Sequence, residues 1–302
     1  PKVLEHDGVF YMVLGARTKD DHGCVLVYTS VDLESWQYAT RIELGEKFGS
    51  MWECPDLFEL DGELLLVCCP QGVPAEGWRY RNPHQCVWFR IEADWETPSF
   101  KIVEQGLPQM VDAGFDFYAP QSFEDAAGHR LMIGWVGCPD ATAENPTVER
   151  GWQCALTVPR ELSMRNGKLC QWPAHEIEKL RGEGLRVAAG ELVEEPGRLF
   201  DAVVSCEGVK TFELEIREGV FVRFANGMLT LDMGDEGFGR DQRSVELGEL
   251  RDLRVLSDAT LVEIFANGGE VAFTSRTYSP AASAMKLQAE GAPSMELYRL
   301  AR

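Results

Sequence analysis

Residues 51–60 read MWECPDLFEL, and this stretch places two carboxylates, Glu53 and Asp56, among apolar side chains. A carboxyl group held against an apolar wall can keep its proton near neutral pH, as a general acid requires. Trp52 and Phe58 are the side chains that we expect to supply such a wall. The same stretch also fits a plain strand in which Glu53 faces solvent beside a turn, and the local residues leave both interpretations open.

Strand signals surround this stretch on both sides. Runs such as GVFYMVLGAR (residues 8–17), ELLLVCCP (63–70) and HRLMIGWVG (129–137) are short, rich in β-branched, leucine or aromatic residues, and bounded by turn residues. Strands of this length at regular spacing predict an all-β protein built as a sandwich, a barrel or a propeller. The run PAHEIEKLRG (173–182) breaks the pattern and predicts a short helix that Pro173 opens.

The pattern of apolar and polar residues changes after that helix. Strand-like runs such as KTFELEI (210–216) alternate apolar and polar residues, and Asn226-Gly227 and Asn267-Gly268 are typical of hairpin turns. We therefore expect a first domain of blade-like sheets over residues 1–172, a connecting helix over 173–182, and a β-sandwich over 183–302.

Composition excludes several classes of partner. The formal net charge is −20 and the isoelectric point is near 4.7, which argues against nucleic acid or an anionic membrane surface. The cysteines number nine and form no CxxC motif, which favours reduced thiols and a cytoplasmic protein. The histidines stand singly, without metal-ligand spacing, so we expect no metal and no cofactor.

Several motifs then follow one another in a recognisable order. They are MWECPDLFEL, CCPQG (68–72), GFDFYAPQSF (114–123), IGWVG (133–137), ALTVPREL (155–162) and SDATLVEIFANGGEVAFTSRTYSP (257–280). The series resembles the β-fructosidases of glycoside hydrolase family 32 over the whole chain. The resemblance implies a five-bladed β-propeller with a pocket at its axis, followed by a C-terminal β-sandwich in which Glu263 is structural.

The resemblance also implies a function. Family members release fructose from β-fructofuranosyl bonds with retention, which needs two carboxyl groups roughly 5 Å apart. Glu53 matches the family's general acid/base. Asp56 then binds a sugar hydroxyl or accepts backbone N–H groups of a turn. Tyr118 hydrogen-bonds the catalytic carboxylates, and Trp135 stacks on the sugar or packs between blades.

One departure from the family concerns the nucleophile. The family's WMNDPNG-like motif, which carries the nucleophilic Asp, and the Arg-Asp pair of its RDP motif are not found in this sequence, and PKVLEHDGVFYMVLGA looks like the continuation of RDP. The chain resembles a member that lacks its first blade and part of its second. We expect no turnover from it alone. We expect self-association, or binding of the missing N-terminal segment, at the open propeller edge.

Two questions stay open at this point. The chain is a β-fructofuranosidase for a small fructoside, or it is a non-catalytic module for fructoside binding or assembly. Sucrose and sucrose 6-phosphate are the favoured substrates, and a phosphate needs local basic groups. Arg79, Arg81 and His84 are candidates for that role, although the same residues fit a solvated loop.

Overall fold

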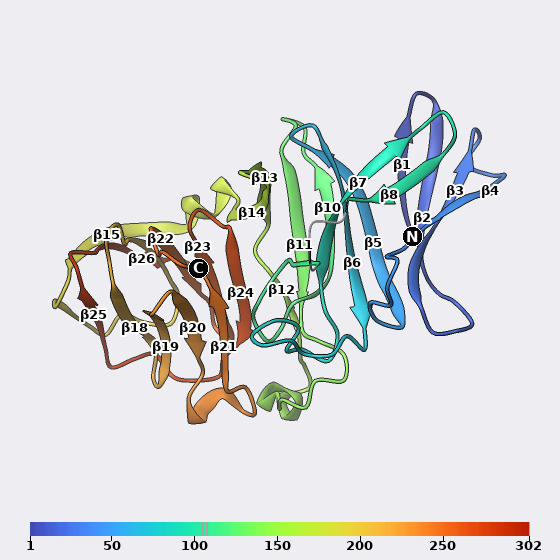
Figure 1. Cartoon of the computed structure of the whole chain (residues 1–302). Coiled ribbons are helices and arrows are strands. Elements are labelled where there is room, and N and C mark those ends of the chain that lie inside the picture. The colour runs from blue at the N-terminus through green and yellow to red at the C-terminus, as the bar shows by residue number, and fades with distance from the viewer. Residues whose placement is uncertain (104–105, 107, 302) are drawn as a thin grey trace.

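The computed structural model describes residues 1–103, 106 and 108–301. Within these residues the chain forms an N-terminal domain of three sheets and a C-terminal domain of two sheets, which stand in a row in Figure 1. The all-β class is confirmed. Among the helices that the structure describes, none has the length and apolar character needed to cross a membrane.

The first sheet has the strand order β1-β2-β3-β4, entirely antiparallel. Its strands are β1 (Lys2–His6), β2 (Val9–Arg17), β3 (Gly23–Ser30) and β4 (Gln37–Ile42). Alternation along β2 and β3 turns a set of fully buried side chains, including Val13 and Val25, toward the second sheet. Gly15 allows this approach, because a Cβ there would lie 2.0 Å from the Trp52 carbonyl oxygen of β5.

The second and third sheets repeat this plan. The second has the order β5-β6-β7-β8 and comprises β5 (Met51–Leu60), β6 (Glu63–Gln71), β7 (Val87–Asp94), β8 (Ser99–Ile102) and β9 (Gln109–Met110), which pairs with β7. The third has the order β10-β11-β13-β14 and comprises β10 (Tyr118–Glu124), β11 (Arg130–Val136), β12 (Ala155–Leu156, on β11), β13 (Arg160–Arg165) and β14 (Lys168–Pro173). The second sheet is packed on both faces, and its strand β6 accordingly reads as a continuous apolar run.

The first strands of the three sheets meet along one line. Lys2 of β1 lies 3.3 Å from the Asp56 carboxylate of β5, and its ammonium also donates to the Ser122 carbonyl oxygen of β10. The Ser122 N–H donates to Asp56 Oδ2 at 2.5 Å. We call these three residues the hub. Sheets that radiate from a shared inner edge have the arrangement of propeller blades, and the predicted loss of a blade and a part of another stays a prediction.

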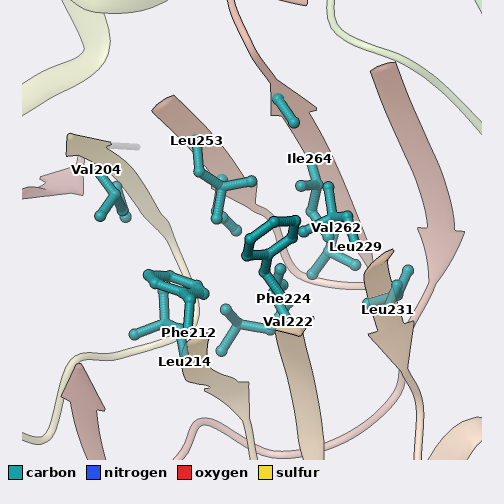
Figure 2. Close-up of a cluster of buried hydrophobic side chains, with 14 of the residues drawn as sticks. Val204, Phe212, Leu214, Val222, Phe224, Leu229, Leu231, Leu253, Val262 and Ile264 are labelled. Carbon is teal, nitrogen blue, oxygen red and sulfur yellow. The ribbon is translucent and has the colours of Figure 1, made fainter. Parts of the chain in front are cut away.

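The C-terminal domain is a sandwich of two six-stranded antiparallel sheets within the described residues. One sheet has the order β15-β26-β17-β22-β23-β24, with β15 (Arg181–Ala188), β17 (Phe200–Ser205), β22 (Asp252–Ser257), β23 (Leu261–Ala266), β24 (Val271–Arg276) and β26 (Ser294–Leu300). The other has the order β16-β25-β18-β19-β20-β21, with β16 (Leu192–Glu194), β18 (Thr211–Arg217), β19 (Val220–Ala225), β20 (Met228–Asp232), β21 (Gln242–Glu246) and β25 (Ala284–Glu290). Figure 2 shows Phe212, Phe224, Leu253 and Ile264 pointing into the space between the sheets, where all four are buried.

The predicted connecting helix is shorter and tighter than expected. A 3-10 helix, η2 (His175–Leu180), replaces it, and β15 begins directly at Arg181. None of the six helical residues is buried, and no side chain caps the first turn. Neither packing nor capping therefore stabilises a longer helix. Two further 3-10 helices, η1 (Pro146–Arg150) and η3 (Asp235–Gly237), arise within loops.

A buried charge cluster joins the two domains. Arg160 of β13 is fully buried and bonds Asp112 at 3.1 Å and Glu263 of β23 at 2.8 Å. It also donates to the Gln171 side-chain oxygen at 2.9 Å. A buried guanidinium needs such complete pairing, because an unpaired charge in the interior is strongly unfavourable.

Replacing Glu263 by Gln should therefore destabilise the protein by about 3–5 kcal/mol, because the Arg160 charge loses its principal partner. The measurement is the free energy of unfolding from urea titration. Glu290→Gln is the control, because the Glu290–Lys210 pair lies at the surface and should contribute far less. Equal effects of the two substitutions would contradict this account.

Candidate active site

Glu53 owes its direction to a β-bulge in β5. Glu53 pairs with Cys69 of β6 and Asp56 pairs with Val67, so two residues on β5 oppose one on β6. Cys54, within the bulge, has a φ of 47°. Residues three apart on a regular strand face opposite sides of the sheet, but the extra residue restores the same face. Glu53 and Asp56 therefore both face the third sheet.

The same device recurs in the third sheet. Tyr118 pairs with Trp135 and Gln121 pairs with Ile133, with a register shift between them, and Ala119 has a φ of 48°. The sequences ECPD and YAPQ thus form equivalent bulges with proline in the same place, where the missing N–H of proline costs no ladder bond.

The two bulges bring Glu53 and Tyr118 together. The Tyr118 hydroxyl donates to Glu53 Oε2 at 2.7 Å. Burial, together with neighbouring Cys69 and Glu53, raises the pKa of Tyr118 well above its ordinary value, so that the phenol remains a hydrogen-bond donor. Trp135 packs edge-on against Tyr118, with 6.4 Å between ring centroids. The structure therefore brings three of the four predicted site residues together, while their roles stay predictions.

Asp56, the fourth predicted site residue, is fully buried in the hub. Its carboxylate contacts the Lys2 ammonium and the Ser122 N–H. Of the two interpretations that the sequence left open, these contacts resemble the acceptor of a backbone N–H more than a ligand for a sugar hydroxyl.

The apolar wall was predicted wrongly for Trp52. Trp52 lies on the face of β5 opposite to Glu53, where it stacks on Phe89 with 5.2 Å between ring centroids. Its indole N–H donates to the Phe48 carbonyl oxygen at 2.7 Å. The error follows from strand geometry, because consecutive residues point to opposite faces. Phe58 does pack in the cluster that contains Tyr118.

His84 is a neighbour of this site that sequence reasoning placed in another role. Its ring lies 6.0 Å from that of Tyr118, and its Nε2 is 2.9 Å from Asp140 Oδ2. The Cys138 thiol donates to the His84 carbonyl oxygen. No local signal connects His84 with Cys138 and Asp140, which lie 54 and 56 residues later in the sequence, so only the folded chain shows that these groups meet.

Asp116 has no free carboxylate oxygen. Arg240 of the sandwich donates to Asp116 Oδ2 at 2.7 Å and to Oδ1 at 2.8 Å, and the Arg276 N–H donates at 2.8 Å. This residue therefore ties the propeller domain to the sandwich. Across the part of the chain that the structure describes, no group of three or more metal-ligating side chains comes together.

Comparisons with known proteins place these features in context. The model of the glycosyl hydrolases family 32 N-terminal domain matches residues 1–173, and the family's C-terminal model matches residues 194–300. The sucrose-6-phosphate hydrolase of Salmonella typhimurium is 36% identical over 299 residues, which cover 94% of this chain and 60% of that protein. The sucrose-6-phosphate hydrolase of Bacillus subtilis is 34% identical, over 92% of this chain and 61% of that protein. The chain thus spans about 60% of the length of these relatives.

Solved structures agree with the fold. A β-fructofuranosidase mutant of Bombyx mori in complex with sucrose matches with a TM-score of 0.86 and 30% identity, over 100% of this chain and 65% of that one. The sucrose-6-phosphate hydrolase of Lactobacillus gasseri matches with a TM-score of 0.89 and 24% identity, over 99% of this chain and 65% of that one. These matches confirm the predicted β-propeller and C-terminal β-sandwich.

The raised pKa of Tyr118 gives a titration test. Because burial keeps this phenol protonated, Tyr118→Phe should leave the alkaline absorbance change of the folded protein unaltered up to about pH 11. The measurement is the ultraviolet signal of ionised phenols. A reduced signal in Tyr118→Phe would show that Tyr118 is not shielded.

Proposed function

Because the chain belongs to glycoside hydrolase family 32, we propose that it carries the acid/base half of a retaining β-fructofuranosidase site. The observation that supports this best is the hydrogen bond between Tyr118 and Glu53, formed where two bulged inner strands meet. The relatives named above are sucrose-6-phosphate hydrolases, and one similar structure holds sucrose. The proposed substrates are therefore sucrose, sucrose 6-phosphate or short fructo-oligosaccharides.

We assign a distinct task to each oxygen of Glu53, and the contact with Tyr118 supports this assignment. Tyr118 occupies Oε2, which leaves Oε1 to carry the proton toward the glycosidic oxygen. When that proton is transferred, the new carboxylate keeps the Tyr118 hydrogen bond and is stabilised by it. The carboxylate can then take a proton from water in the second step of a retaining reaction. The second carboxyl group that this reaction needs, the nucleophile, was not found among the motifs of this sequence, and its absence stays a prediction.

Glu53→Gln tests the assignment. In the protein that carries this chain, the substitution should lower kcat for sucrose or sucrose 6-phosphate by about a hundredfold to ten-thousandfold, because an amide donates no catalytic proton. Glu59→Gln is the matched control, because Glu59 lies on the same strand with an exposed side chain. Wild-type turnover by Glu53→Gln would rule out the acid/base role, provided that its melting temperature is unchanged.

A second candidate function is a non-catalytic fructoside-binding or assembly module. The outer face of the first sheet favours it, since Val3, Met12, Tyr28 and Tyr38 form one cross-strand row. Val3 is 44% exposed and Tyr38 is 56% exposed. Such a row is suited to pack against another sheet, supplied by a second copy or by an N-terminal segment of the same protein. Fructoside binding without turnover by the protein that carries this chain would favour this module over the hydrolase.

The location of the protein in the cytoplasm is likewise a proposal. It is supported by the free state of all nine cysteines in the structure and by the reducing conditions that such thiols require.

A further inference from the structure

Two cysteines of the second sheet lie directly opposite each other. The ladder between β6 and β7 ends at the pair of Cys68 and Val87. The next residues along this antiparallel register are Cys69, in β6, and Cys86, immediately before β7. Cys69 is fully buried and Cys86 is 6% exposed, and both belong to the cluster that contains Tyr118. The two side chains therefore share one face of the sheet.

The neighbouring hydrogen bonds show which kind of pair the two cysteines form. The Gln85 N–H donates to the Pro70 carbonyl oxygen at 2.9 Å, and the Cys86 carbonyl oxygen accepts from the Val111 N–H at 2.9 Å, on the side away from β6. Hydrogen-bonded and non-hydrogen-bonded pairs alternate along an antiparallel ladder. Cys69 and Cys86 thus form a non-hydrogen-bonded pair, in which the two side chains are closest together.

This kind of pair suits a disulfide. The Cα atoms of a non-hydrogen-bonded antiparallel pair lie about 4.5 Å apart, and a disulfide joins Cα atoms that are roughly 4.4–6.8 Å apart. The strands therefore already hold the two residues at a distance that an S–S bond can span, without movement of the backbone.

The thiols themselves are in contact. Burial and the contact with the Cys69 thiol raise the pKa of Cys86 well above its ordinary value. Burial also raises the pKa of Cys54 and of Cys138 to about 11, and Cys69 contributes there only through its charge. Among the cysteines around Cys69, Cys86 is therefore the one placed to bond with it.

The pair closes the base of a loop that flanks the candidate active site. Residues 70–85 join Cys69 to Cys86 and carry His84, whose ring lies 6.0 Å from that of Tyr118. Across the other edge of β6, Cys69 pairs with Glu53. A bond between the two cysteines would therefore fix both ends of this loop beside Glu53.

We propose that Cys69 and Cys86 form a reversible modification site, which holds two thiols under reducing conditions and a cross-strand disulfide after oxidation by a peroxide. The inference does not depend on the proposed function. It agrees with the free state of the cysteines in the structure, because disulfides that form in reducing compartments are usually transient.

The reaction balances with hydrogen peroxide as the oxidant. Peroxide transfers one oxygen atom to the sulfur of one cysteine, which becomes a sulfenic acid, and the rest of the peroxide leaves as water. The sulfur of the other cysteine displaces this oxygen as a second water, and the S–S bond forms. A dithiol reductant reverses the change by thiol–disulfide exchange. Because Cys86 is buried and protonated, its oxidation should be slower than that of an exposed thiol.

Peptide mapping provides the first test. The protein that carries this chain is treated with hydrogen peroxide until the half-buried Cys154 is fully oxidised, and the remaining thiols are alkylated in denaturant. We expect a peptide pair joined through Cys69 and Cys86, which dithiothreitol separates. Free thiols or sulfinic acids at both positions overturn the proposal, and a bond from Cys69 to Cys54 or Cys138 overturns the choice of partner.

Urea unfolding of variants provides the second test. Because a disulfide constrains the unfolded chain, peroxide treatment should raise the urea midpoint of the wild type by about 1 M. Cys69→Ala and Cys86→Ala should each abolish this rise. Cys68→Ala is the matched control, because Cys68 is equally buried on the opposite face of the same strand, and it should keep the rise. A rise that survives in Cys69→Ala contradicts the proposal.

The proposal and the proposed function fail separately, because mass and unfolding report the disulfide without any turnover. A peptide pair linked through Cys69 and Cys86 in a protein that hydrolyses no fructoside supports the modification site and rejects the hydrolase. Turnover by a protein whose Cys69 and Cys86 stay thiols after the treatment supports the hydrolase and overturns the modification site.

Discussion

The candidate site depends on one extra residue in each of two strands. Without the bulge in β5, Glu53 and Asp56 would point to opposite faces of the second sheet. Asp56 would still hold the hub, but Glu53 would lie on the face that contains Trp52 and would not reach Tyr118. The bulge thus allows one short strand both to anchor the inner edge of the propeller and to present its acid to a neighbouring blade.

The two domains are tied by charges that neither could bury alone. Arg160 belongs to the propeller and Glu263 to the sandwich, while Asp116 and Arg240 make the reverse connection. Each pair is buried while the domains stay packed together, and removal of one partner would leave the other charge buried and uncompensated. A cavity of about 500 Å³ lies along this same boundary and is lined by residues of both domains, so its shape depends on the sandwich as much as on the propeller.

Much of the fold could be predicted from the sequence, because alternation and turn residues identify strands locally. The ordered motifs went further and pointed to Glu53, Tyr118 and Trp135, which the structure brings together. The face of the strand on which Trp52 lies was predicted wrongly. The alternation of side chains along a strand would by itself have placed Trp52 and Glu53 on opposite faces. The contacts of His84 and Arg243 could not be predicted, because they join segments that meet only through the packing of several sheets.

The hub has a consequence for how the protein folds. The bond from Lys2 to Ser122 closes a loop of 120 residues, and Asp56 lies between the two along the chain. Contacts between such distant residues form slowly, because the entropy of closing the loop is lost before the contact stabilises the structure. The individual hairpins can form early, but the line of inner strands is completed only when all three sheets have assembled. The alignment of Glu53 with Tyr118 is therefore a late event in folding. A partly folded chain can contain the individual strands before Glu53 lies beside Tyr118.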